Sequence, residues 1–228
     1  MITELHDFVR FRLALGRDSH RGILNQCERH EGDSDSDSDS DDVAATVTKE
    51  FESYMEDQST WPDVLDSDRF LRAFGDLNAT GIVALADFSC CLSCGTSEIG
   101  EVVPDGRERR GYVFAHRQDM ENAVAGAGCD LAFGSFGDGE SAAGIGEAVV
   151  AALRGHGFDP GWSGDPAERV HVPLTWRRIR ATSPVSSAAP KAAFRSYGLR
   201  TESSSSTPRT PSGAPSVAAT SPWPRPRG

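Results

Sequence analysis

Short apolar runs of strand length alternate with amphipathic stretches of helical length through the central part of this 228-residue chain. Strands are expected near residues 81–88, 112–116 and 131–134, and helices near residues 95–103, 119–125 and 141–154. Because parallel neighbours are joined by helical crossovers, the alternation predicts an α/β fold with a mixed, mainly parallel sheet. Two further short strands, at 158–162 and 170–176, flank a glycine-aspartate-proline turn and predict a C-terminal antiparallel hairpin.

The flanking segments set the boundaries of this domain. Residues 1–16 predict a short amphipathic helix, and residues 17–42, which end in alternating aspartate and serine, predict an acidic, disordered linker. Apolar residues at helical spacing in 43–54 and 70–77 predict two helices ahead of the first strand. Residues 181–228 are rich in proline and serine and predict a disordered tail. The α/β domain is therefore expected over residues 43–180.

Charge and hydropathy exclude several classes of function. The net charge of −11 argues against non-specific nucleic-acid binding, which needs clustered cations. No apolar run is long enough to cross a membrane, and charged residues interrupt the N-terminus where a secretory signal would need an apolar stretch. We therefore expect a cytoplasmic protein that acts on an unknown protein or small molecule. In that compartment the five cysteines are expected to be free, metal-bound or redox-active rather than disulfide-bonded.

Three of the five cysteines fall within five consecutive residues, where the first expected strand gives way to a helix. Cys91 and Cys94 have the two-residue spacing of many zinc ligands, and Cys90 can add a third thiolate. His116, at the end of the next strand, is the candidate for the fourth ligand. Cys129 begins the third strand, so a parallel sheet would place it at the opposite edge. The predicted metal site therefore consists of Cys90, Cys91, Cys94 and His116, with zinc as the metal.

Other interpretations of these residues stay open. Cys91 could attack and Cys94 resolve in a thiol-dependent redox enzyme, although the surrounding sequence departs from the thioredoxin pattern. The cysteines could also be buried as small apolar side chains. A small hydrolase using His116 as a base and Asp119 as its orienting partner is a further possibility, although the sequence provides no activated nucleophile beside them.

Two motifs in this part of the chain resemble those of a known family. Residues 88–95 read F-S-C-C-L-S-C-G and residues 111–119 read G-Y-V-F-A-H-R-Q-D. Together with the later helix and tryptophan-containing strands, they resemble a family of uncharacterised bacterial α/β domains, a domain of unknown function, over residues 45–180. The resemblance implies that Cys90, Cys91, Cys94, His116 and Asp119 form one recurrent group. It implies no reaction.

The leading hypothesis is a non-catalytic binding or regulatory module that holds a metal through its cysteine cluster. It depends on the clustered thiols and on the lack of a complete catalytic set in the sequence. The alternative is the redox enzyme that uses Cys91 and Cys94.

Overall fold

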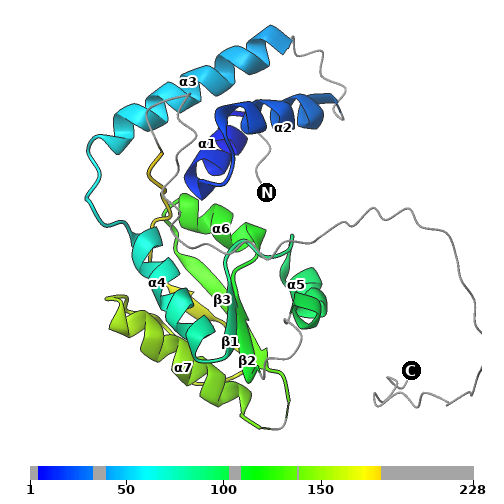
Figure 1. The fold of residues 1–228 in the computed structure, drawn as a ribbon, viewed down its shortest axis with the longest axis vertical. Helices are drawn as coiled ribbons and strands as arrows, with labels where there is room; N and C mark the ends of the chain where they lie inside the picture. The colour runs from blue at the N-terminus through cyan, green and yellow to red at the C-terminus, as the bar shows by residue number, and fades with distance from the viewer. Residues whose placement is uncertain (1–4, 33–39, 103–108, 138, 181–228) are drawn as a thin grey trace, which may run out of the picture. The chain divides into compact units, whose positions relative to one another are not determined.

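A computed structural model of the protein describes residues 5–32, 40–102, 109–137 and 139–180. Helices precede a small sheet, and further helices and strands alternate after its first strand (Figure 1). In chain order the elements are α1 (Leu5–Leu15), α2 (His20–Gly32), α3 (Ser40–Gln58), α4 (Asp66–Ala79), β1 (Ile82–Leu85), α5 (Leu92–Glu98), the 3-10 helix η1 (Ile99–Val102), β2 (Gly111–Phe114), α6 (Arg117–Val124), β3 (Cys129–Ser135), α7 (Ala142–Gly155) and β4 (Val170–Val172). The predicted mixed α/β fold is therefore confirmed.

The sheet has the order β1-β2-β3-β4, and only its first pair is parallel. Strands β2 and β3 pair antiparallel, as do β3 and β4, so the prediction of a mainly parallel sheet was wrong. The reason is the connection through α6, whose eight residues span only about 12 Å. Gly126 and Gly128 then adopt positive φ angles of 82° and 83° and reverse the chain. As a result β3 starts at the end of the sheet where β2 finishes.

The predicted C-terminal hairpin is present only in reduced form. Residues 158–162 form no strand, and a single antiparallel bridge joins Gly161 to His171. The second half of the hairpin, β4, pairs instead with β3, with Cys129 opposite Val172. Gly128 allows this close pairing, because a Cβ there would come within 2.6 Å of the His171 ring.

Helices cover the two faces of the sheet unequally. Helices α4 and α7 pack against each other and against β1 and β3 on one face (Figure 1). Their apolar side chains join the larger core, which includes Phe70, Phe74, Val113, Leu131, Ile145 and Leu153. The other face carries a smaller buried cluster of Val83, Ile99, Phe114 and Ala132 beneath α5 and η1. Helix α5, which carries Cys94, lies on this thinly covered face.

The N-terminal helices contribute to the larger core. Helix α1, which the sequence predicted, packs against α2 and α3. Helix α2 lies in the segment predicted to be a disordered linker, so that prediction was wrong for His20–Gly32. Its side chains are mostly polar, but Ile23 and Cys27, four residues apart, are fully buried. Residues 33–39 of the predicted linker and the predicted tail at 181–228 lie outside the described residues.

The outer edge of the sheet is covered by a side chain. β1 is one of the two edge strands, and Asn78 at the end of α4 lies beside it. The Asn78 amide donates to the Ala84 carbonyl at 3.0 Å, and its oxygen accepts from the Ala84 N–H at 3.2 Å. Asn78 thus occupies the backbone groups of Ala84, which a further strand would otherwise use. Among the described helices, none is long and apolar enough to cross a membrane.

Candidate metal centre

The loop between β1 and α5, residues 86–91, holds the first two cysteines in an unusual backbone conformation. Asp87 and Ser89 adopt left-handed φ angles of 52° and 61°. Such conformations cost roughly 1–3 kcal/mol each in non-glycine residues and persist only where neighbouring structure holds them. Here the Phe88 N–H donates to the Ala115 carbonyl at 2.9 Å, and the Arg117 N–H donates to the Ser89 carbonyl at 3.2 Å. Ala115 and Arg117, in the segment after β2, therefore hold the loop in its left-handed conformation.

Two arginines from distant parts of the chain anchor the same loop through Asp87. Arg17, which follows α1, places Nη1 3.0 Å from Asp87 Oδ2 and donates from Nη2 to the Ala86 carbonyl at 2.7 Å. Arg117 places Nε 3.8 Å from Asp87 Oδ1. Burial raises the pKa of Asp87, and the two guanidinium groups oppose this effect. With Asp87 ionised, the three side chains leave one net positive charge beside the loop.

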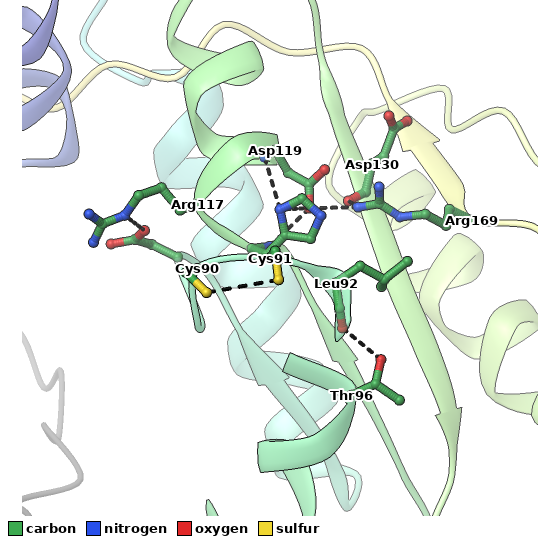
Figure 2. A network of polar contacts seen from close by, with 10 residues as sticks. Cys90, Cys91, Leu92, Thr96, Arg117, Asp119, Asp130 and Arg169 are labelled. Carbon is green, nitrogen blue, oxygen red and sulfur yellow. Dashed lines mark hydrogen bonds and ion pairs between the residues drawn. The ribbon is translucent and has the colours of Figure 1, made fainter. Parts of the chain in front are cut away.

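The structure brings the three clustered cysteines together. Their Sγ atoms all lie within 4.8 Å of one another. Cys90 Sγ lies 3.8 Å from Cys91 Sγ (Figure 2). Cys90 is exposed, while Cys91 and Cys94 are partly exposed. The hypothesis that these cysteines are buried packing residues was therefore wrong. Cys91 is the N-cap residue of α5, so Cys94 lies one turn into the helix.

The sulfur spacing matches metal coordination better than a disulfide between neighbours. With zinc–sulfur bonds of about 2.3 Å, two ligands at tetrahedral positions lie about 3.8 Å apart. Cys90 and Cys91 show this separation. As adjacent residues their Cα atoms are about 3.8 Å apart, below the usual 4.4–6.8 Å of disulfides. A disulfide within the cluster would therefore join Cys94 to Cys90 or to Cys91. Cys91 and Cys94 are separated by two residues, which is the spacing of many redox-active cysteine pairs.

The thiols of Cys91 and Cys94 differ in acidity. The backbone amide of Cys94, followed by the thiols of Cys94 and Cys90, lowers the pKa of Cys91. Hydrogen bonds with the Cys90 and Cys91 sulfurs, followed by the negative charge on those sulfurs, raise the pKa of Cys94 to about 12. Cys91 therefore loses its proton before Cys94, and a bound cation would be needed to ionise Cys94 at neutral pH.

Helix α5 rests directly on the sheet through Gly95. A Cβ on Gly95 would come within 2.5 Å of the Phe114 ring. The Gly95 N–H also donates to the Cys91 carbonyl at 2.9 Å, which closes the first turn of the helix. The absence of a side chain at this residue lets the helix approach β2 and keeps Cys94 beside the loop.

His116 does not join the three cysteines. Among the described residues, the group with ligand atoms within 4.8 Å of one another contains the cysteines alone. His116 is the N-cap of α6 and is 4% exposed. Its Nδ1 lies 3.4 Å from the Asp119 amide nitrogen, and its own N–H donates to Asp119 Oδ2 at 2.9 Å. Burial, the main cause, lowers the pKa of His116. Its role as a fourth ligand stays a prediction.

Asp119 belongs to a buried polar network rather than to the thiol cluster. Its Oδ2 accepts from Arg169 Nη2 at 2.5 Å, and the same arginine donates to the Asp130 carbonyl (Figure 2). Asp119 is 2% exposed and also accepts from the backbone of His116. Its contacts tie α6 to β3 and to the segment before β4. His116 Nδ1 also lies 3.2 Å from Asp119 Oδ2, so the histidine–aspartate pair of the hydrolase hypothesis is present in the structure, and its use in catalysis stays a prediction.

The structure also changes the position expected for Cys129. Because β3 runs antiparallel to β2, Cys129 lies at the end of the sheet where β2 finishes, not at the opposite edge. Its side chain is 1% exposed, and burial raises its pKa. It is not part of the group formed by the other three cysteines.

Sequence reasoning missed the anchoring role of Asp87 and Arg17. The two residues are 70 positions apart, and no periodic pattern links them. The one local signal was an aspartate directly after an apolar strand, since Asp tolerates left-handed φ better than most residues.

Comparison with protein families decides where the chain belongs. The model of a family described as a domain of unknown function (DUF6891) matches residues 1–180. The chain is a member of this family. The resemblance to a domain of unknown function is thereby confirmed, and the DUF6891 match extends further than residues 45–180, since it includes α1, α2 and α3. No curated protein and no solved structure matched the chain.

Proposed function

We propose that this DUF6891 domain is a non-catalytic, metal-binding regulatory module in which Cys90, Cys91 and Cys94 hold zinc. The observation that carries the proposal is the exposed group of three sulfurs within 4.8 Å, on a loop with two left-handed residues. Strain of this kind is concentrated at functional sites, and several contacts hold it here. The accessible thiols fit a reducing cytoplasm, where the partner would be a protein or a small molecule.

The charge around the loop supports a divalent ion. Three thiolates and Zn²⁺ carry a net charge of −1. Arg17, Arg117 and ionised Asp87 contribute a net charge of +1 beside the loop. Thiolate ligands suit zinc in preference to magnesium or calcium, which prefer oxygen.

Metal analysis tests this proposal. Full-length protein purified without an affinity tag, under reducing conditions, is expected to bind near-stoichiometric zinc by mass spectrometry of the metal. Separate Cys90→Ser, Cys91→Ser and Cys94→Ser variants should each lose most of it. Ser93→Ala is the matched control, because Ser93 is an exposed residue of the same segment and supplies no thiol. Wild-type protein with no more zinc than the Cys91→Ser variant would refute the proposal.

The predicted fourth ligand, His116, can be tested without losing its structural role. Asparagine is among the best N-cap residues, so His116→Asn keeps an acceptor for the Asp119 amide while removing the imidazole. If His116 coordinates zinc, this variant loses zinc affinity. Unchanged affinity in a folded variant would remove His116 from the ligand set.

Thiol redox chemistry is the second candidate function. The lowered pKa of Cys91 suits an attacking thiolate, and the raised pKa of Cys94 suits a thiol that stays protonated until it resolves the intermediate. With hydrogen peroxide as oxidant, the two thiols give one disulfide and two waters, which lowers the protein mass by two hydrogens. Mass spectrometry should then find Cys91 linked to Cys94. All three thiols unchanged after peroxide treatment would refute this alternative.

A further inference from the structure

The thiol cluster supplies three ligands and leaves one side of a bound ion open. Among the described histidine, cysteine, aspartate and glutamate residues, no fourth side chain places a ligand atom with the three sulfurs. The His116 ring places neither Nδ1 nor Nε2 in this group, and Cys129 is buried within the core. A tetrahedral ion held by three thiolates therefore needs a ligand from elsewhere.

We propose that the fourth ligand is a thiolate from outside the chain, so that the domain binds a thiol compound through its metal. This inference rests on the proposed metal site. In the exchange, a thiol loses its proton to solvent and its sulfur replaces a solvent molecule on the ion, with no change in oxidation state. The thiol comes either from a small molecule of the glutathione type or from a cysteine of a second copy.

The surroundings of the cluster favour such a ligand. Cys90 is exposed, so the ion is reachable from solvent. Three thiolates already make the ion soft and reduce its power to activate water, which favours a fourth sulfur over a water-activating role. The described residues also place no carboxylate or imidazole in the group that would serve as a base for such a water.

The charges beside the loop suit a thiol that carries carboxylates. Arg17 and Arg117 have side chains that are 46% and 45% exposed. Figure 2 shows Arg117 on the Cys90 side of the loop. A guanidinium group has five N–H donors, and Asp87 and Ala86 accept from only some of them. The remaining donors can contact the carboxylates of a glutathione-type thiol bound at the ion.

Cobalt substitution makes the coordination visible. Full-length protein is loaded with Co²⁺, and its sulfur-to-cobalt charge-transfer and d–d bands are recorded before and after addition of reduced glutathione. S-methylglutathione is the matched control, because it has the same charges but no free thiol. We expect the bands to gain charge-transfer intensity and to shift with glutathione, but not with S-methylglutathione.

Size measurement separates the two sources of thiolate. A spectrum that shifts with glutathione while the protein stays monomeric supports a small thiol. A metal-dependent dimer that shows the four-sulfur spectrum without added thiol supports a cysteine from a second copy. Bands that do not change, in a monomer, would overturn the inference, as would bands altered by His116→Asn. Protein that takes up no Co²⁺ at the thiols would refute the metal site itself and hence both proposals.

Discussion

Gly95 lies so close to Phe114 that a Cβ on the glycine would come within 2.5 Å of the aromatic ring. This contact joins the helix that carries Cys94 to the middle of the sheet. The geometry of an exposed thiol site therefore depends on a residue that has no side chain. A substitution at Gly95 can therefore change the position of Cys94 relative to Cys90 and Cys91 while all three cysteines are retained.

Gly95→Ala should displace α5 and weaken metal binding. The added methyl group meets a ring that is fully buried, so overpacking should cost about 1–3 kcal/mol in the free energy of unfolding. Urea unfolding and competition with a zinc-binding dye measure the two effects. Gly100→Ala is the control, because a Cβ at that residue would meet no atom within 4 Å beyond its own chain neighbours and local helix backbone. Equal behaviour of the two variants would contradict the role assigned to the contact.

Arg17→Met should loosen the cysteine loop. The variant removes hydrogen bonds to the Asp87 carboxylate and the Ala86 carbonyl, and leaves Asp87 with Arg117 at 3.8 Å. We expect a loss of about 1–2 kcal/mol in the free energy of unfolding, since Arg17 is only half-buried and the contact is charge-assisted. Arg72→Met, at an exposed residue of α4, serves as the control in the same urea titration. A loss no larger than that of Arg72→Met would rule out the anchoring role.

Stability should fall in mildly acidic solution because of His116. Its pKa in the folded protein is lowered from the ordinary 6.5, mainly by burial. Between the lowered value and 6.5 the unfolded chain binds more protons than the folded one, so the free energy of unfolding decreases as the pH falls through 6.5. Urea titrations from neutral pH to about pH 5 should show a steeper decrease for the wild type than for His116→Asn. Parallel curves would show that His116 does not carry the effect.

The metal-free thiols should react at different rates. Cys91 has a lowered pKa and is partly exposed, whereas the pKa of Cys94 is raised to about 12. Brief treatment with iodoacetamide near neutral pH should therefore label Cys91 ahead of Cys94, since the thiolate is the reactive form. Buried Cys27 and Cys129 are internal references that should remain unlabelled in the folded protein. Peptide mass spectrometry gives the order, and Cys94 reacting first would contradict it. Added zinc should protect the whole cluster.

Local patterns in the sequence predicted the elements well but not their directions. The helical spacing of Val43 and Val47 predicted α3, and Ser141 was identified as the start of α7, where it accepts from the Gly144 N–H. The direction of β3 depends on the length of the α6 connection and on the glycine turns after it, which strand patterns do not describe. Helix α2 was missed because few of its residues are apolar, and its stability comes from tertiary packing.

The candidate site likewise contains residues whose proximity the sequence predicts and residues whose contacts depend on the fold. Cys90, Cys91 and Cys94 are neighbours in the chain, so their proximity could be predicted without knowing the fold. His116 was chosen because it ends the adjacent strand, but its ring serves the capping of α6, a role that depends on the position of Asp119 three residues later. The Arg17 contact joins two elements far apart in sequence and emerges only from the packing of α1 near the loop.

Asn78 restricts how this domain can associate with other chains. Its amide imitates a neighbouring strand at Ala84, so an incoming peptide would have to displace two hydrogen bonds before it could extend the sheet at that edge. β1 has only four residues, and the Asn78 side chain makes the backbone N–H and carbonyl of Ala84 unavailable to a partner. A partner that docks at this edge would find the backbone groups of Ala84 already bonded, whereas the sulfurs of the thiol cluster remain accessible.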